Sequence, residues 1–194
     1  MPKKFTAVTS KLVPLFNPNI DTDQIIPAQY VNAVGGAALA AALFVNRKAE
    51  DPDFVLNRPE MKDRAIMLCG PNFGCGSSRE AAAWALEAGG FRAAVGTTFN
   101  ETFARNCVQS CFPTIRLSPS DFDALAAAYS ENSDLEIKVD LAARCLTAPA
   151  AKLSFPTGID DFTADLMVSG IDELSYLLER EARIAQFESE RALP

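Results

Sequence analysis

The sequence contains no histidine among its 194 residues. This absence excludes nucleophilic catalysis through Ser-His-Asp or Cys-His arrangements, and it excludes zinc sites that use histidine ligands. Any proton transfer by this chain therefore has to use a carboxylate, an amine, a phenol, a thiol or an activated serine.

Long apolar runs and basic clusters are also absent. No stretch approaches the roughly 20 consecutive apolar residues that a membrane-spanning helix needs. The first residues, Met1–Phe5, carry two lysines without an apolar segment after them, so they do not resemble a secretory signal peptide. The net charge is −7 and lysine and arginine do not cluster, which argues against nucleic-acid binding. We therefore expect neither a membrane nor a nucleic-acid partner.

Cysteine is sparse, and the five cysteines form an odd set. A secreted disulfide scaffold would be smaller and richer in cysteine, so reduced thiols in the cytoplasm are the better interpretation. Cys107 and Cys111 are one turn apart on a predicted helix, but two thiols do not make a metal site. Asp21 and Asp23 are a weak signal for a cation, because aspartates are common in turns. We expect no metal bound by this chain.

The hydrophobic content of 48% is enough for a sizeable core. The residue patterns predict strands at 5–16, 64–69, 91–96, 112–117, 135–139, 144–147 and 152–155, and helices at 36–45, 79–88, 99–109, 119–129, 159–168 and 172–190. Strands alternate with helices from 64 to 129, which predicts an α/β fold with a mixed, partly parallel sheet flanked by helices. We expect one domain over 1–194, with a long excursion at about 46–63 and a charged, surface-lying helical extension at about 172–194.

The most informative segment is the turn-rich loop 72–80, which follows a predicted strand and opens a predicted helix. Gly74 and Gly76 let the backbone turn tightly and approach a ligand. The free N–H groups and the positive dipole end of a helix start favour an anion, and the planar guanidinium of Arg79 suits a carboxylate. These features predict a small carboxylate or phosphate site.

Other interpretations of this loop remain open. Ser77 and Glu80 have the spacing of a capping box, so Ser77 could serve only to cap the helix. The loop lacks the pattern of a nucleotide P-loop, and it has too few glycines for a dinucleotide fingerprint.

Several segments resemble one known family. GPNFGCGSSRE at 70–80 is similar to the signature of the aconitase superfamily swivelling domain, and NIDTDQIIP at 19–27 is similar to the second signature of the 3-isopropylmalate dehydratase small subunits. Further similarity lies in 12–15, 53–57, 84–86 and 103–107. The match runs in order over about residues 5–175, so two long motifs occur at the expected separation.

The resemblance implies an aconitase-like swivelling domain in the small subunit of a hydro-lyase. Such an enzyme isomerises a small hydroxy dicarboxylate by dehydration and rehydration, here 2-isopropylmalate to 3-isopropylmalate in leucine biosynthesis. It also implies a large partner subunit that carries a [4Fe-4S] cluster as the Lewis acid. By the motif, Ser77 is the catalytic base, Ser78 and Arg79 bind a substrate carboxylate, and Asp23 lines the site.

This sequence departs from the family pattern near the signature. Ala81 and Ala83 replace a histidine and a proline, Cys111 replaces a glycine, and Pro113 is shifted by one position. The alternatives are therefore a related dehydratase acting on another substituted malate or maleate, or a non-catalytic carboxylate-binding subunit. Turnover of a Ser77→Ala variant discriminates catalysis from binding alone.

Overall fold

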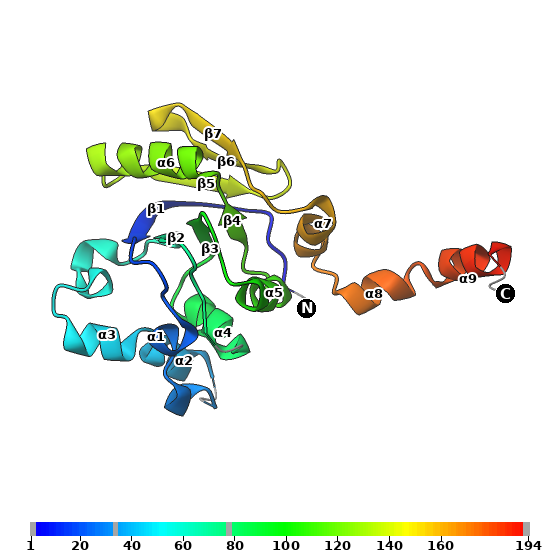
Figure 1. Cartoon of the computed structure of the whole chain (residues 1–194), viewed down its shortest axis with the longest axis horizontal. Coiled ribbons are helices and arrows are strands. Elements are labelled where there is room, and N and C mark those ends of the chain that lie inside the picture. The colour runs from blue at the N-terminus through cyan, green and yellow to red at the C-terminus, as the bar shows by residue number, and fades with distance from the viewer. Residues whose placement is uncertain (1–2, 33–34, 77–78, 192–194) are drawn as a thin grey trace.

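The computed structural model describes residues 3–32, 35–76 and 79–191. Within them a seven-stranded sheet has the order β4-β3-β2-β1-β5-β6-β7 (Figure 1). Its strands are β1 (Ala7–Leu15), β2 (Ile66–Cys69), β3 (Ala93–Gly96), β4 (Thr114–Arg116), β5 (Glu136–Asp140), β6 (Cys145–Ala148) and β7 (Leu153–Pro156). Strands β1 to β4 pair in parallel, whereas β5 to β7 are antiparallel to their neighbours. The predicted mixed, partly parallel sheet is confirmed.

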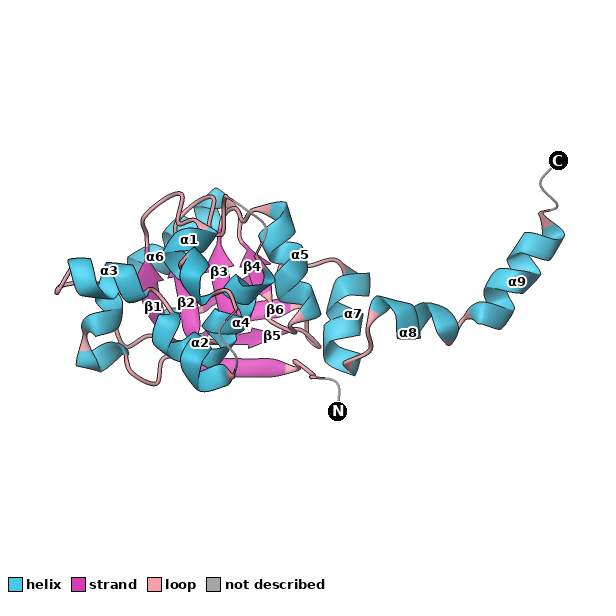
Figure 2. Ribbon diagram, turned by 90° about the horizontal axis from the view of Figure 1, so that it is seen from below, coloured by secondary structure: helices cyan, strands magenta, loops and turns pink. Residues whose placement is uncertain are grey.

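Helices pack on both faces of this sheet, and the last two helices extend away from it (Figure 1). They are α1 (Thr22–Ile25), α2 (Gly36–Ala42), α3 (Val45–Glu50), α4 (Glu80–Ala88), α5 (Glu101–Gln109), α6 (Pro119–Glu131), α7 (Asp161–Ser169), α8 (Glu173–Leu178) and α9 (Glu181–Glu190). Helices α1, α2, α4 and α5 lie on one side of the parallel strands, and α6 lies on the other (Figures 1 and 2). None of the helices in the described ranges has the length and apolarity to cross a bilayer.

The central parallel strands β2 and β3 are buried along their whole length, which explains their continuous apolar sequences. Successive side chains of a strand point to opposite faces, so Leu12 and Leu68 join the core beneath α6, whereas Val13 and Met67 join the core beneath α4. The core beneath α6 also contains residues of β5 and β6, such as Ile137. The sheet therefore curls around that core.

Local structure differs from the predicted pattern at one helix and adds detail in two loop segments. The predicted helix 172–190 is two helices, α8 and α9, because the helical backbone is interrupted at Glu179 and Arg180. In the segment that follows β1, the short helix α1 begins at Thr22, and the Asp21 carboxylate accepts the Gln24 N–H as its cap. The excursion 46–63 contains α3 and two 3-10 turns, and its Phe54 side chain is buried in the core.

A buried arginine joins the excursion to the sheet. The Arg64 side chain is only 5% exposed. Its Nη1 donates to the carbonyl oxygens of Leu12 (2.8 Å) and Ser133 (2.7 Å), and its Nη2 donates to Asp134 (3.0 Å). Its Nε donates to the Glu60 carbonyl oxygen at 2.9 Å. One guanidinium thus links β1, the end of the excursion and the turn before β5.

We predict that Arg64→Lys lowers the free energy of unfolding by about 2–4 kcal/mol. A lysine has three donors on one nitrogen and cannot reproduce the planar fork, so buried carbonyl groups lose their partners. Urea denaturation measures the change. The control is Arg92→Lys, at an exposed ion pair with a 3.9 Å separation from Glu87, for which we expect a change within about 0.5 kcal/mol. Equal stability of the two variants would contradict the role of Arg64.

Candidate active site

The two signature segments lie side by side because β1 and β2 are neighbouring parallel strands. Parallel strands end at the same edge of a sheet, and that edge is where open α/β sheets bind ligands. Beyond the strands the two loops pair with each other through a parallel bridge between Asp21 and Cys75. The Gly74 N–H donates to the Ile20 carbonyl oxygen at 2.7 Å, and the Thr22 N–H donates to that of Cys75 at 3.0 Å. The fold thus joins segments far apart in the sequence into one site.

Two asparagines that were not predicted as site residues connect these loops through hydrogen bonds. The Asn72 side-chain amide donates to Asn19 Oδ1 at 2.7 Å, and the Asn72 backbone N–H donates to Thr98 Oγ1 at 2.7 Å. Asn19 and Asn72 both have positive φ angles, 57° and 58°. Asparagine tolerates this conformation better than most residues. The available signal in the sequence was the position of each asparagine beside a proline in a turn.

The two loop glycines have conformations that restrict substitution. Gly74 has φ +76°, and a Cβ there would lie 2.2 Å from the ring carbon Cγ of Phe103. Gly76 has φ +87°, and its Cβ would meet the Asp21 side chain at 3.4 Å. The predicted need for glycine at both positions therefore has a physical basis in this fold. At Gly74 that basis is close packing against α5, and at Gly76 it is backbone conformation.

We predict that Gly74→Ala destabilises the protein by about 2–4 kcal/mol. The new methyl group combines a left-handed backbone penalty with overpacking against Phe103. The matched control is Gly36→Ala, because Gly36 starts α2 and has nothing within 4 Å of its would-be Cβ. That change should be neutral or stabilise by up to about 1 kcal/mol. Thermal or urea unfolding measures the stability of both variants. A Gly74→Ala variant as stable as the wild type would contradict the packing of Gly74 against Phe103.

Arg79 and Asp23 form an ion pair across the two loops. Arg79 Nη1 donates to Asp23 Oδ1, and Nη2 donates to Oδ2 at 2.9 Å. The hydrogen bond from Arg79 lowers the pKa of Asp23, so Asp23 stays ionised at neutral pH. The Arg79 side chain is 19% exposed and the Asp23 side chain 57%. The pair fixes the plane of the guanidinium and uses two of its five N–H donors, and no further hydrogen bond joins the other three to the residues that the structure describes.

The position at which α4 begins bears on the predicted capping box of Ser77 and Glu80. Arg79 is the N-cap residue, has an extended backbone (φ −126°, ψ 111°), and makes no side-chain cap hydrogen bond. A helix that began directly after Ser77 would need helical angles at Arg79, so the capping-box interpretation of Ser77 and Glu80 is wrong. Ser77 and Ser78 themselves lie outside the described residues. Their assigned roles stay predictions, and so do those of Asp23, Arg79, Gly74 and Gly76.

The described residues do not fit a metal centre. Across the described ranges, no group of three or more Cys, Asp or Glu side chains could hold a metal ion, and histidine is absent. The five cysteines are free thiols. Burial raises the pKa values of Cys69 and Cys107 well above the usual range, so both stay protonated at neutral pH. An iron–sulfur cluster needs thiolate ligands, and this chain offers no set of them here.

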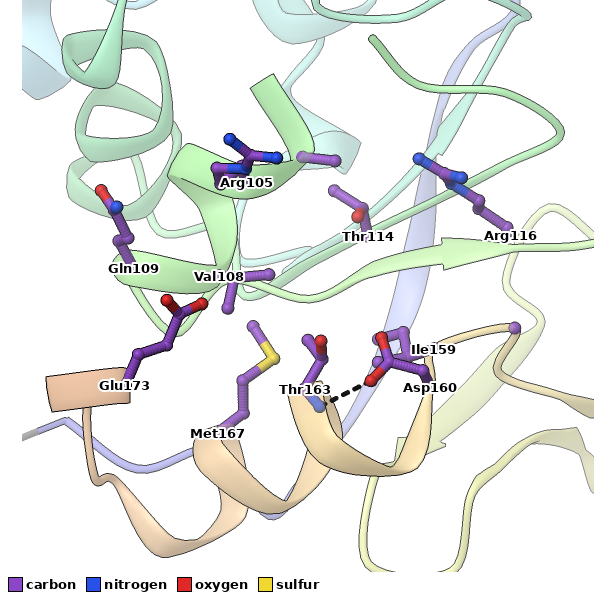
Figure 3. Close-up of a pocket in the computed structure, with 12 residues that line it drawn as sticks. Arg105, Val108, Gln109, Thr114, Arg116, Ile159, Asp160, Thr163, Met167 and Glu173 are labelled. Atoms are coloured by element: carbon purple, nitrogen blue, oxygen red, sulfur yellow. Dashed lines mark hydrogen bonds between the residues drawn. The ribbon is translucent and has the colours of Figure 1, made fainter. Parts of the chain in front are cut away.

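A hollow of about 470 Å³ lies apart from the signature loops, between α5, β4 and α7 (Figure 3). Arg105 and Arg116 lie on its upper side in this view, with Asp160 and Glu173 on its lower side. None of its lining residues belongs to segments 19–27 or 70–80. It is therefore a feature separate from the candidate active site.

Comparison with known proteins places this geometry in a family. The model of the aconitase C-terminal domain matches residues 2–120. A 3-isopropylmalate dehydratase small subunit of Solibacter usitatus is 41% identical over 190 residues, covering 98% of this chain and 96% of the relative. One of Roseiflexus sp. is 37% identical over 192 residues, covering 96% and 93%. A solved 3-isopropylmalate dehydratase structure from Methanocaldococcus jannaschii superposes with a TM-score of 0.66 at 22% identity, covering 93% of this chain and 98% of that one.

The site lies at the carboxyl edge of a parallel sheet in an aconitase-type domain. The chain belongs to the aconitase C-terminal domain family and, within it, to the 3-isopropylmalate dehydratase small subunits. The solved structure, below 25% identity, supports the fold alone.

Proposed function

We propose that this chain is the small subunit of a hydro-lyase that interconverts 2-isopropylmalate and 3-isopropylmalate in leucine biosynthesis. The observation that carries the proposal is the Arg79–Asp23 pair, which joins the two signature segments beside the Ser77–Ser78 loop. A guanidinium with spare donors is suited to one carboxylate of a small dicarboxylate. Family membership over nearly the whole chain supports this choice of substrate class.

The reaction requires a group that takes a proton from carbon. Ser77 is that base in our proposal: its alkoxide oxygen takes the proton from one carbon, the electrons of the C–H bond form the C=C double bond, and the hydroxyl group on the neighbouring carbon leaves as hydroxide. The proton held by Ser77 and this hydroxide together make up the water that is lost, which returns Ser77 to the alkoxide. The reverse addition then puts the hydroxyl group on the other carbon. Ser78 and Arg79 bind a substrate carboxylate, and Gly74 and Gly76 keep the loop backbone close to it. Asp23 orients Arg79.

A serine hydroxyl is too weak an acid to ionise in water. It needs a dry site with oriented donors, and here these are the N-terminal end of α4 and the Arg79 guanidinium. Asp23 is more than half exposed, so the site of the isolated chain is wet. We infer that a large partner subunit closes the site in the cytoplasm and holds the [4Fe-4S] cluster, which supplies the Lewis acid.

Our first functional prediction separates the two serines. In the complex rebuilt from purified subunits, Ser77→Ala should abolish turnover and proton exchange at the substrate carbon, while substrate still binds. The Ser78→Ala control should mainly raise KM. Proton exchange is followed in deuterated water by NMR. Exchange by Ser77→Ala at near the original rate would show that Ser77 is not the base, and would favour a carboxylate-binding module without catalysis of its own.

The second functional prediction concerns the role of Arg79 in substrate binding. Arg79→Lys should lower kcat/KM by roughly 10- to 1000-fold and raise KM, because a point charge cannot pair bidentately with a carboxylate. Asp23→Asn keeps the shape of the partner but removes its charge, and it should have a smaller effect in the same direction. Steady-state kinetics of the rebuilt complex measure both, with Arg92→Lys as the matched surface control. Unchanged kinetics of Arg79→Lys would exclude Arg79 from substrate binding.

A further inference from the structure

Helices α8 and α9 form an arm that leaves the body of the protein beyond α7 (Figures 1 and 2). Neither helix has a buried residue. Among the described residues, the arm carries five of the eight large apolar side chains that are exposed, namely Leu174, Leu177, Leu178, Ile184 and Phe187. Exposed apolar groups concentrated in this way mark an interaction surface.

The apolar residues of the arm follow helical spacing. Leu174, Leu177 and Leu178 are at positions i, i+3 and i+4 of α8, and Ile184 and Phe187 are at i and i+3 of α9. This spacing gives each helix one apolar face, as in helices that lie in a hydrophobic groove of a partner. Helices this short are marginal in water by themselves, so a partner would stabilise the arm.

The root of the arm is attached to the body by aromatic contacts. The rings of Phe162 on α7 and Tyr176 on α8 pack edge to face at 4.9 Å between centroids. The Arg180 guanidinium lies over the Tyr176 ring, 3.4 Å from its centroid. Asp172 caps α8 by accepting the Ser175 N–H. These contacts set the direction in which the arm leaves the body.

The exposed apolar surface continues from the arm to the helix that follows the signature loop. A hollow of about 540 Å³ at the root of the arm is lined by Trp84, Leu166, Ile171 and Leu174. Trp84 is 44% exposed, although the alanines around it on α4 are buried. Helix α4 starts directly after Arg79, so Trp84 is about 6 Å along the helix axis from the site. The charged hollow of Figure 3 adjoins this one, because both are lined by Met167 and Glu173.

The comparisons indicate which partner this surface fits. The aconitase C-terminal domain model matches residues 2–120, so its match does not include the arm. The curated small subunits align over 98% and 96% of this chain, so the alignments include most of the arm. The arm therefore belongs to the part of the chain that aligns with proteins named as small subunits, and a small subunit implies a large one. A second copy of this chain would bring no groups to the active site, whereas a large subunit would.

We propose that the arm and Trp84 together form the surface on which the large catalytic subunit docks, with the apolar faces of α8 and α9 laid against it. This inference rests on the proposed function, since it takes the partner from it. A large subunit docked on this surface would cover both the arm and α4. Because α4 begins directly after Arg79, the docked subunit would also lie next to the candidate active site. The same contact that stabilises the arm therefore brings the large subunit to the loop that has to be kept dry.

The test compares two variants of the full chain with equal added charge. Ile184→Glu with Phe187→Glu puts two carboxylates on the apolar face of α9. Ala182→Glu with Ser189→Glu puts two carboxylates on the opposite side of the same helix, as the turn of 3.6 residues requires. All four positions are exposed, so neither variant should change the thermal unfolding of the body.

Each variant is titrated with the purified large subunit of 3-isopropylmalate dehydratase from the same organism, and turnover is measured. For the apolar-face variant, we expect the half-saturating concentration to rise about 100-fold or more, because buried apolar anchors carry much of the affinity of an interface. Its plateau turnover should match the wild type, since the active site is intact. The control should stay within about twofold of wild type.

Trp84 provides a second measurement, because it is the only tryptophan of the chain. Labelled with 5-fluorotryptophan, the chain should give one 19F resonance that shifts when the large subunit is added.

Equal half-saturating concentrations for the two charge variants would overturn the proposal, and so would a Trp84 resonance that does not shift on addition of the large subunit. If wild-type chain does not bind the large subunit at all, the proposed function fails too. If sedimentation shows a dimer of this chain that only the apolar-face variant breaks, with affinity for the large subunit unchanged, the occupant is a second copy.

Discussion

The parallel pairing of β1 with β2 is the constraint on which the candidate site depends. These strands are more than fifty residues apart in sequence, and their pairing places the loops that follow them at one edge of the sheet. The loops are then joined by the Asp21–Cys75 bridge and by the hydrogen bond from Gly74 to Ile20. Slippage by one residue would turn Leu12 and Val13 toward the wrong cores. The burial of both sheet faces therefore fixes the geometry of the site.

The alternation of strands and helices from 64 to 129 was predictable because each element has a strong local signal. β2 is a continuous apolar run, and α5 and α6 start at Asn100 and Ser118, whose side chains cap them. The motif residues that form the Arg79–Asp23 pair were also found from the sequence. Their contact with each other was not predicted, because it arises from the register of two strands and not from either segment alone.

The arm shows where sequence reasoning has less to work with. Segment 172–190 has charged residues throughout, which suggested a charged helix lying on the surface. Its leucines instead form an exposed apolar face on α8, and the chain breaks before α9. A periodic pattern does not state whether an apolar face packs on its own domain or on another chain. Trp84 is a similar case, because its neighbours Ala83 and Ala85 are fully buried whereas its own side chain is exposed.

The departures from the family pattern alter packing and leave the described site groups in place. Ala81 and Ala83 are buried in the core that α4 shares with α2, where small side chains let the two helices approach closely. Cys111 has a φ of 53°, a conformation that favours the glycine of the family pattern. Its thiol contacts the Lys3 carbonyl oxygen at 3.1 Å, an interaction that glycine could not make. The substitutions therefore affect the core-facing side of α4 and the turn after α5 that contacts the N-terminal segment, while Arg79 and Asp23 keep their bidentate contact.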